Sequence, residues 1–242
     1  HNTLIMNAIL ALSLNDFRST FRDPIFKGLL VFPFVAFAIV RWLVPVLEQR
    51  YPAIAPYKEV ILMWACMQSA TMFGMIYAFL FLEEKEENVW QAIRVLPISG
   101  LTLVASRLLI GLVVSTLVNF TLIHWGGIVT LPLYQELLLS LQYSFCAPLL
   151  ALMLGAFANN RIEGLAQMKI ASLLLNLPGL IYFLPQKFLH VLALIPTYWS
   201  FRSLEMAADQ NDKFWLFFAI GTIFYLGSIY WLNRRLEFKT QS

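Results

Sequence analysis

Long apolar runs, separated by short polar stretches, cover most of the chain. Each of six runs is about as long as the 20 or so residues that a helix needs to cross a bilayer. They predict membrane spans at residues 25–47, 60–82, 101–125, 137–157, 165–184 and 214–232. The runs are too long for the alternating strands of about ten residues that form membrane barrels. The pattern therefore predicts an all-α membrane protein in which residues 1–242 form a single transmembrane domain.

Residues 4–23 are apolar on one side only. Apolar side chains recur there at helical spacing, at Leu10, Leu14, Phe17 and Phe21. The other side carries the charged residues Asp16, Arg18 and Arg22. The segment has too many charges to span the membrane, so we expect an amphipathic helix that lies in the interface on the cytoplasmic side.

The apolar stretch from Leu165 to Phe201 is 37 residues long, almost twice what one span of about 20 residues needs. Pro178, Pro185 and Pro196 divide it. We expect the fifth span to end near residue 184, and residues 186–212 to form a re-entrant or interfacial helical pair on the outer side before the sixth span. Such broken backbone is tolerated at membrane depth only where protein buries it.

Composition agrees with a membrane protein, because 60% of the residues are hydrophobic and only 13% are charged, whereas a soluble domain carries about 25% charge. The first 23 residues carry charges throughout and lack a small-residue cleavage site, so we expect no cleaved signal peptide. Cys66 and Cys146 fall within predicted spans, where cysteine behaves as a small apolar residue. We therefore expect no disulfide and no metal site.

The distribution of Lys and Arg predicts the orientation. With the amino terminus in the cytoplasm, eleven of the 17 lie on the inner side, five lie on the outer side, and Arg41 lies within the membrane. Cytoplasmic loops of membrane proteins carry the excess of Lys and Arg. We therefore expect both termini in the cytoplasm.

The densest charged stretch follows the second span, at residues 83–97. It begins with the carboxylates of Glu83, Glu84, Glu86 and Glu87. Val89, Ile93 and Leu96 then recur at helical spacing, which predicts an amphipathic helix from about Glu84, with Trp90 beside the apolar stripe, Arg94 near its end and a proline that stops it. Such a helix can lie on a membrane surface or bind in a partner's groove. The alternative is a solvated loop with no partner.

The motifs of common catalytic sites are missing. The chain has no G-x-x-x-x-G-K-[ST] phosphate loop, no G-x-S-x-G, no H-E-x-x-H and no C-x-x-C. His124 and His190 lie far apart near predicted outer ends, where we interpret each as an interfacial packing residue. We therefore expect no enzymatic activity in this chain.

Polar residues inside the predicted spans indicate a substrate pathway or a dimer interface. The polar candidates are Gln68 and Thr71 in the second span, Asn119 in the third and Asn176 in the fifth, and Met67 beside Gln68 is an apolar candidate. The alternative for each polar residue is an ordinary interhelical hydrogen bond, which is worth about 0.6 kcal/mol.

This architecture resembles the permease subunits of type-2 ATP-binding-cassette exporters. Those permeases have six spans, a cytoplasmic interfacial helix before the first, a short cytoplasmic helix between the second and third, and a re-entrant pair before the sixth. The residues that carry the resemblance are Asp16-Phe17-Arg18 through Arg22-Asp23-Pro24, and Glu83-Glu84-Lys85-Glu86 with Leu96-Pro97-Ile98-Ser99. Among these permeases, the compact drug exporters, including the fluoroquinolone-exporter type, look most similar.

The resemblance implies a function and its partners. The chain would be the permease of an exporter that moves a hydrophobic or amphipathic substrate, drug or lipid-like, across the cytoplasmic (inner) membrane of a bacterium. Two permeases, identical or paralogous, would face each other, each bound to a separate ATP-binding subunit whose P-loop holds ATP and Mg. The chain itself would bind no cofactor and no nucleic acid.

The resemblance also implies roles for individual residues. Coupling to the ATPase would fall to Glu83, Glu84, Glu86, Glu87, Val89, Trp90, Ile93, Arg94 and Leu96. A second cytoplasmic contact would be made by Asp16, Arg18 and Arg22.

Two other functions stay open. An ATP-independent carrier or channel would need a carboxylate within the membrane for coupling, and no Asp or Glu lies in the core of any predicted span, which favours the exporter. A membrane anchoring or assembly protein without transport would also use the cytoplasmic helix to bind a partner. The sequence does not separate that function from the permease.

Overall fold

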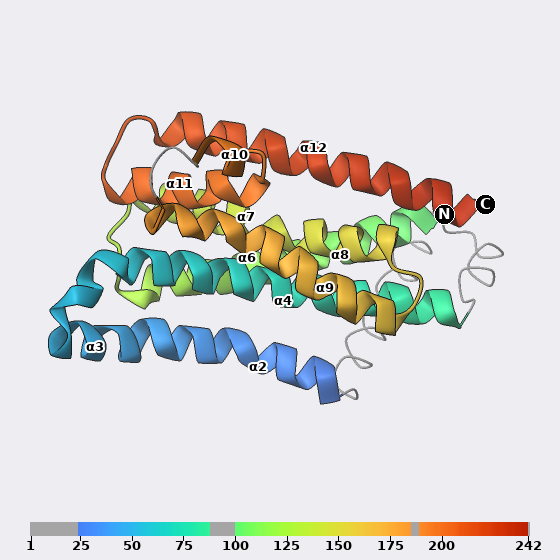
Figure 1. The fold of residues 1–242 in the computed structure, drawn as a ribbon, viewed down its shortest axis with the longest axis horizontal. Coiled ribbons are helices and arrows are strands. Elements are labelled where there is room, and N and C mark those ends of the chain that lie inside the picture. Colours follow the sequence, from blue (N-terminus) through green and yellow to red (C-terminus); the bar gives the residue numbers. More distant parts are fainter. Residues whose placement is uncertain (1–23, 88–99, 185–188, 242) are drawn as a thin grey trace.

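The computed structural model describes residues 24–87, 100–184 and 189–241, and this part of the chain is helical throughout, with short connections. Six stretches are long and apolar enough to cross a membrane. They are Phe26–Arg50, Pro52–Glu86, Val104–Gly126, Leu133–Phe157, Arg161–Tyr182 and Phe214–Leu236. They lie side by side along the long axis of the molecule (Figure 1). The predicted all-α fold with six membrane spans is confirmed.

The first three spans are built from α2 (Pro24–Ala38), a π-helical turn (Ile39–Leu43) and α3 (Val44–Arg50), then a 3₁₀ helix (Pro52–Tyr57) with α4 (Lys58–Glu86), then α6 (Gly100–Gly126). The remaining elements are α7 (Leu133–Ser144), α8 (Cys146–Phe157), α9 (Arg161–Asn176), a 3₁₀ helix (Leu177–Tyr182), α10 (Leu189–Leu192), α11 (Pro196–Ala208) and α12 (Phe214–Gln241). The predicted interfacial helix at residues 4–23 lies outside the described residues.

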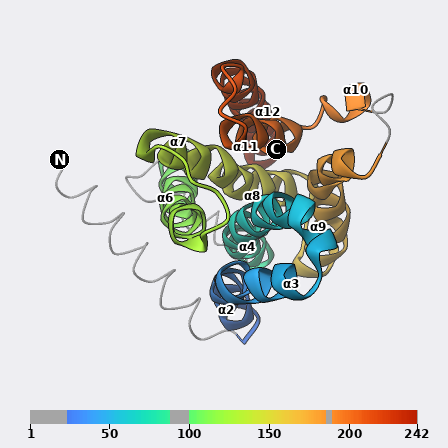
Figure 2. The ribbon, with the colours of Figure 1, turned by 90° about the vertical axis from the view of Figure 1, so that its left-hand side faces the viewer.

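The second and fourth spans form the centre of the bundle. In each, 78% of the most apolar stretch is buried inside the protein, whereas the other four spans bury no more than 33%. Figure 2 shows α4 and α8 in the middle, with α2 below them, α6 and α9 on opposite sides, and α11 and α12 above. The central spans are enclosed by the other helices, whereas the outer ones carry many exposed large apolar side chains, as expected of helices that face lipid.

Small residues let the two central helices approach closely. A Cβ atom built on Gly74 of α4 would overlap the carbonyl oxygen of Ala147 in α8, so no side chain fits between the backbones there. Ala70 and Ala151 are also fully buried on these helices. Helices in membranes pack through such small residues because lipid supplies little hydrophobic drive for their association.

The fourth span is two helices because of Pro148. A proline has no N–H and its ring clashes with the carbonyl four residues earlier, which belongs here to Ser144. α7 ends at that residue and α8 begins at Cys146.

The second span extends further than the apolar pattern predicts. α4 has 29 residues, which at 1.5 Å per residue is roughly 43 Å and exceeds the hydrocarbon thickness of about 30 Å. Its last turn therefore contains Glu83–Glu86. This differs from the expected helix beginning near Glu84, because these carboxylates end one helix and do not begin another. Residues 88–97, the rest of the predicted coupling helix, lie outside the described residues.

Two helices occupy the predicted re-entrant segment between the fifth and sixth spans, α10 and α11. α9 first tightens into a 3₁₀ helix that contains Pro178. α11 then packs along α12 and buries a polar row, Thr197, Ser200 and Ser203. That these helices dip into the bilayer stays a prediction.

Candidate functional site at the charged end of α4

The last turn of α4 and its partners form a network that we call the charged end, made of Glu83, Glu84, Lys85, Glu86, Arg107 and Arg161. It lies where α4, α6, α8 and α9 meet, at the right of Figure 1. Four consecutive charged residues of α4 contact three other helices there.

Glu84 and Arg107 make a buried ion pair between α4 and α6. Both guanidinium nitrogens Nη1 and Nη2 of Arg107 donate to the carboxylate, each at 2.7 Å. The Arg107 side chain is 2% exposed and that of Glu84 17%, and the guanidinium also lies 5.8 Å from the ring centroid of Phe81. A two-pronged geometry with little solvent makes this the strongest kind of ion pair in the network.

Lys85 caps the end of α8. Its Nζ donates to the carbonyl oxygen of Ala158 at 2.9 Å and to that of Gly155 at 3.4 Å. The last carbonyls of a helix have no partner within the helix and carry the negative end of its dipole. A lysine from a neighbouring helix therefore satisfies both the hydrogen bonds and the charge.

Glu83 and Glu86 hold the start of α9. The backbone N–H of Arg161 donates to Oε1 of Glu86 at 2.7 Å, and Nη1 of Arg161 lies 3.6 Å from the Glu83 carboxylate. Carboxylates are favoured at a helix N-terminus. The Arg161 guanidinium also lies 5.8 Å and 5.9 Å from the ring centroids of Phe26 and Phe79, so the contact extends to α2.

The structure thus gives three of the predicted coupling carboxylates partners within the chain. Glu83, Glu84 and Glu86 bind arginine side chains or backbone, while the side chain of Glu87 is exposed. The other predicted coupling and contact residues lie outside the described residues: Val89, Trp90, Ile93, Arg94, Leu96, Asp16, Arg18 and Arg22. Their predicted roles are untested.

The sequence analysis missed Arg107 and Arg161 as partners of the acidic block. A usable signal existed for Arg107. Two consecutive spans joined by a short link are antiparallel, so residues shortly before and shortly after the link lie at the same end of the bundle. A lone arginine in an apolar span needs a charged partner, and Glu84 is at the matching position 23 residues earlier.

The predicted pathway residues do not converge on one site. Met67 is fully buried in the core. Thr71 donates to the carbonyl and the side-chain oxygen of Gln68 on its own helix, and Asn176 donates to Ser172 one turn earlier. Only Asn119 bonds to another helix, where its Nδ2 donates to Ser144 Oγ at 3.0 Å.

A polar cluster of other residues lies in the interior, between α7, α8, α11 and α12. The Tyr225 hydroxyl lies 3.0 Å from Ser200 Oγ and 3.2 Å from Cys146 Sγ. Gln142 Nε2 donates to the Phe218 carbonyl at 3.0 Å. Within the described part of the chain, the Gln142 side-chain oxygen and the Tyr143 hydroxyl are buried without a hydrogen-bond partner. The hydroxyls of two buried tyrosines, Tyr143 and Tyr225, thus make this part of the interior polar. Cys66 and Cys146 are both free, buried thiols.

The opposite end of the bundle carries smaller polar groups. His124 Nδ1 lies 2.7 Å from the carboxylate of Glu136, which is 5% exposed. The imidazole also stacks on Phe120 and meets Trp125 edge to face. His124 therefore packs against aromatic rings and also contacts a buried carboxylate, which the sequence did not indicate. Its predicted position at the membrane interface stays a prediction. The side chain of His190 lies outside the described residues.

Comparison with known proteins gives a family match over nearly the whole chain. The sequence model of a family described as "Fluoroquinolones export permease protein Rv2686c-like" matches residues 16–233. Two proteins of Mycobacterium tuberculosis are each 27% identical over 240 residues, which is 96% of this chain and 95% of theirs. They are the fluoroquinolones export permease proteins MT2760 of strain CDC 1551 / Oshkosh and Rv2686c of strain ATCC 25618 / H37Rv. No solved structure matches.

Proposed function

Because this chain belongs to the Rv2686c-like family of fluoroquinolone export permeases, we propose that it is the membrane-spanning permease of an ATP-binding-cassette exporter for hydrophobic or amphipathic drugs. The observation that carries the proposal is the match over residues 16–233, which includes the charged end, five of the spans in full and most of the sixth. Two copies of the permease, or this chain and a paralogue, work with separate P-loop subunits that bind ATP and Mg.

The charged end supports a route by which the ATPase moves the spans. The predicted coupling helix spans residues 83–97, and its remaining residues, the coupling segment 88–97, follow directly after Glu86 and Glu87. When the ATPase moves that segment, the last turn of α4 moves with it. The Glu84–Arg107 pair passes the movement to α6, the Lys85 cap passes it to α8, and the Glu86–Arg161 contact passes it to α9.

No described span has a carboxylate in its middle, which supports transport driven by ATP over transport driven by an ion gradient. The described spans carry their Asp and Glu residues near their ends, such as Glu59, Glu84, Glu136 and Glu163. A carrier driven by protons or sodium ions ordinarily needs an ionisable group inside the membrane.

Co-purification of the tagged chain from its native membrane tests the proposal. We expect a P-loop ATPase in stoichiometric amount. A chain that exports fluoroquinolones but is isolated alone in mild detergent would overturn the ATP-dependent mechanism in favour of a carrier. A chain that neither exports fluoroquinolones nor co-purifies with an ATPase would point to an anchoring or assembly protein.

Substitutions in the coupling segment test the route. The triple variant V89D/W90D/I93D should fold in the membrane, because the spans are unchanged. It should no longer bind the ATPase subunit or confer drug resistance, because charges replace apolar residues of the coupling segment. The matched control is N211D/K213D, in the exposed turn between α11 and α12 at the opposite end, which should keep both. Unchanged ATPase recruitment and resistance in the triple variant would exclude this segment as the coupling element.

A further inference from the structure

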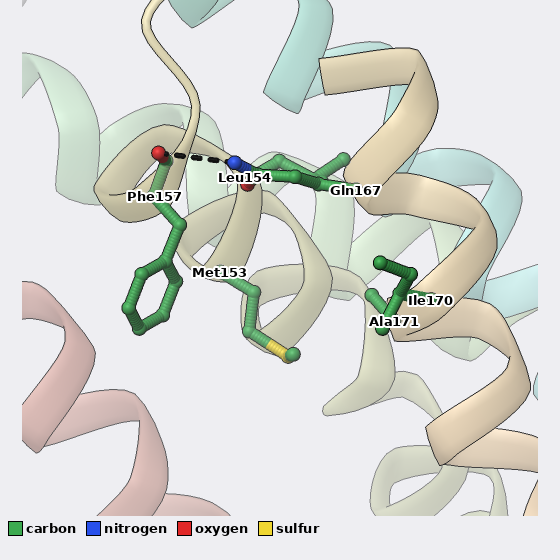
Figure 3. A pocket seen from close by; sticks show the side chains of 6 residues that line it. All are labelled: Met153, Leu154, Phe157, Gln167, Ile170 and Ala171. Carbon is green, nitrogen blue, oxygen red and sulfur yellow. Dashed lines mark hydrogen bonds between the residues drawn. The ribbon is translucent and has the colours of Figure 1, made fainter. Parts of the chain in front are cut away.

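An apolar groove lies between α8 and α9, next to the charged end and outside the polar interior. Its lining residues, which define the α8–α9 groove, are Met153, Leu154, Phe157, Gln167, Ile170 and Ala171. Figure 3 shows Met153 and Phe157 on one wall, with Gln167, Ile170 and Ala171 on the other. The cavity volume is about 270 Å³, larger than the roughly 150 Å³ apolar cavity that admits a benzene ring.

The groove opens on the outer surface of the bundle. Ile170, on its rim, is 71% exposed, and on the same helix Leu173 is 65% exposed. α9 is one of the spans with mostly unburied apolar surface. In a membrane, this surface contacts lipid, and the groove is accessible to a molecule that arrives sideways through the bilayer.

The groove extends from the end of α8 to the middle of α9. Phe157 is the last residue of α8, and Met153 is four residues earlier, which is roughly 6 Å along the helix. On α9 the lining begins at Gln167 in the second turn and continues to Ile170 and Ala171 in the middle of the helix. A long apolar chain that enters beside Phe157 can therefore follow the groove along α9.

The rim of the groove carries a positive charge. The guanidinium carbon of Arg235, on α12, lies 4.5 Å from the ring centroid of Phe157. The Trp231 ring lies 6.5 Å from the same ring. Among the residues that the structure describes, Arg235 has no carboxylate at ion-pair distance, whereas Arg107, Arg161 and Arg202 each have one. An exposed arginine beside an apolar groove can hold an anionic group whose apolar part enters the groove.

We infer that the α8–α9 groove binds an anionic phospholipid, with an acyl chain against Met153, Phe157 and Ile170 and the phosphate at Arg235. The outward opening and the exposed arginine beside it favour a lipid over a transported drug, which must reach the interior. The positive-inside count predicts that this end lies in the cytoplasmic leaflet, which is rich in anionic lipids. The Gln167 amide group is already engaged with the Phe157 carbonyl and Glu163, so Arg235 is the group that selects charge.

Native mass spectrometry of the purified chain, together with any subunit that co-purifies, tests the inference by titration with phosphatidylglycerol and phosphatidylcholine. We expect phosphatidylglycerol to bind more tightly. Arg235→Gln should weaken phosphatidylglycerol binding roughly fivefold, the size of one basic residue's contribution beside an anionic surface, and leave phosphatidylcholine binding unchanged.

The matched control is Arg234→Gln on the same turn, whose guanidinium lies over Tyr230, 5.3 Å from the ring centroid, and away from the groove lining. It should leave both lipids unaffected. Ala171→Leu on one wall and Met153→Phe on the other both fill the groove, so each should weaken the binding of both lipids. An unchanged melting temperature checks that these variants fold.

Three results would overturn the inference. Equal binding of the two lipids would remove the role of the charge. Equal losses in the Arg235 and Arg234 variants would indicate general attraction to a basic surface. Displacement of phosphatidylglycerol by a fluoroquinolone would make the groove part of the transport pathway.

Discussion

The two ends of the bundle are held together in different ways. At the charged end, ion pairs and caps join residues far apart in sequence: Glu84 and Arg107 are 23 positions apart, Lys85 and Ala158 73, and Glu86 and Arg161 75. At the opposite end, the separations between oppositely charged partners are 3 for Arg202 and Glu205, 10 for Lys58 and Glu48, and 12 for His124 and Glu136.

This difference separates a region that acts as a unit from one that does not. Charged contacts tie four helices to one another at the charged end. At the opposite end, the charged pairs lie within one helix or across one short loop, and the longer-range contacts are a neutral donor, from Tyr182 to Glu205, and stacked rings such as Tyr134 and Trp215. We therefore expect removal of a contact at the charged end to affect stability and transport together, and removal at the other end to affect neither strongly.

The largest effect is expected for Arg107→Met. It leaves the Glu84 carboxylate without its partner in a site that is mostly shielded from water, and breaking a buried pair in this way costs about 3 kcal/mol or more. For a chain of this size, that lowers the melting temperature by roughly 6–12 °C. Thermal unfolding in detergent measures the shift, and drug efflux in cells should be lost with it.

The double variant E84Q/R107M is the control, because it removes the unpaired charge as well. It should recover more than half of the lost stability. A double variant no more stable than Arg107→Met would show that the arginine acts by packing on Phe81 and not by its charge.

An intermediate effect is expected for Lys85→Met. The last carbonyls of α8 lose a charged donor, and hydrogen bonds to charged groups are worth about 1.5–3 kcal/mol. Hydrogen exchange should become faster in the last turn of α8 but not in α6. Faster exchange in all helices alike would mean that Lys85 has no specific partner.

The smallest effect is expected for Lys58→Met, at the opposite end. The side chains of Lys58 and Glu48 are 34% and 35% exposed and their charged atoms are 3.3 Å apart. Such exposed pairs contribute less than about 1 kcal/mol, so the melting temperature should change by no more than roughly 2–4 °C. A loss comparable to that of Arg107→Met would show that the two ends do not differ.

The spans were predictable from the sequence because the length of an apolar run is a one-dimensional property. The end of α4 was not, because hydropathy drops at Leu82 while the helix continues to Glu86, supported by partners on other helices. A pattern of apolar residues ends where the membrane ends, and a helix ends where its hydrogen bonds end.

The candidate site was predictable in part. The acidic block stood out by its charge, but its partner Arg161 is the first residue of the fifth span, and only the folded bundle places it there. Among the polar residues of the spans, the sequence could not distinguish Asn119, which bonds to another helix, from Asn176, which bonds to its own. That distinction depends on the rotation of each helix about its axis.

The close contact between Gly74 and Ala147 has a mechanical consequence. Because a Cβ at position 74 would overlap the facing backbone, α4 and α8 are already in contact there and cannot move closer together. Glu84 lies ten residues further along α4, which is roughly 15 Å at 1.5 Å per residue. If the charged end tilts α4 about this contact, the part of the helix before Gly74 swings in the opposite direction.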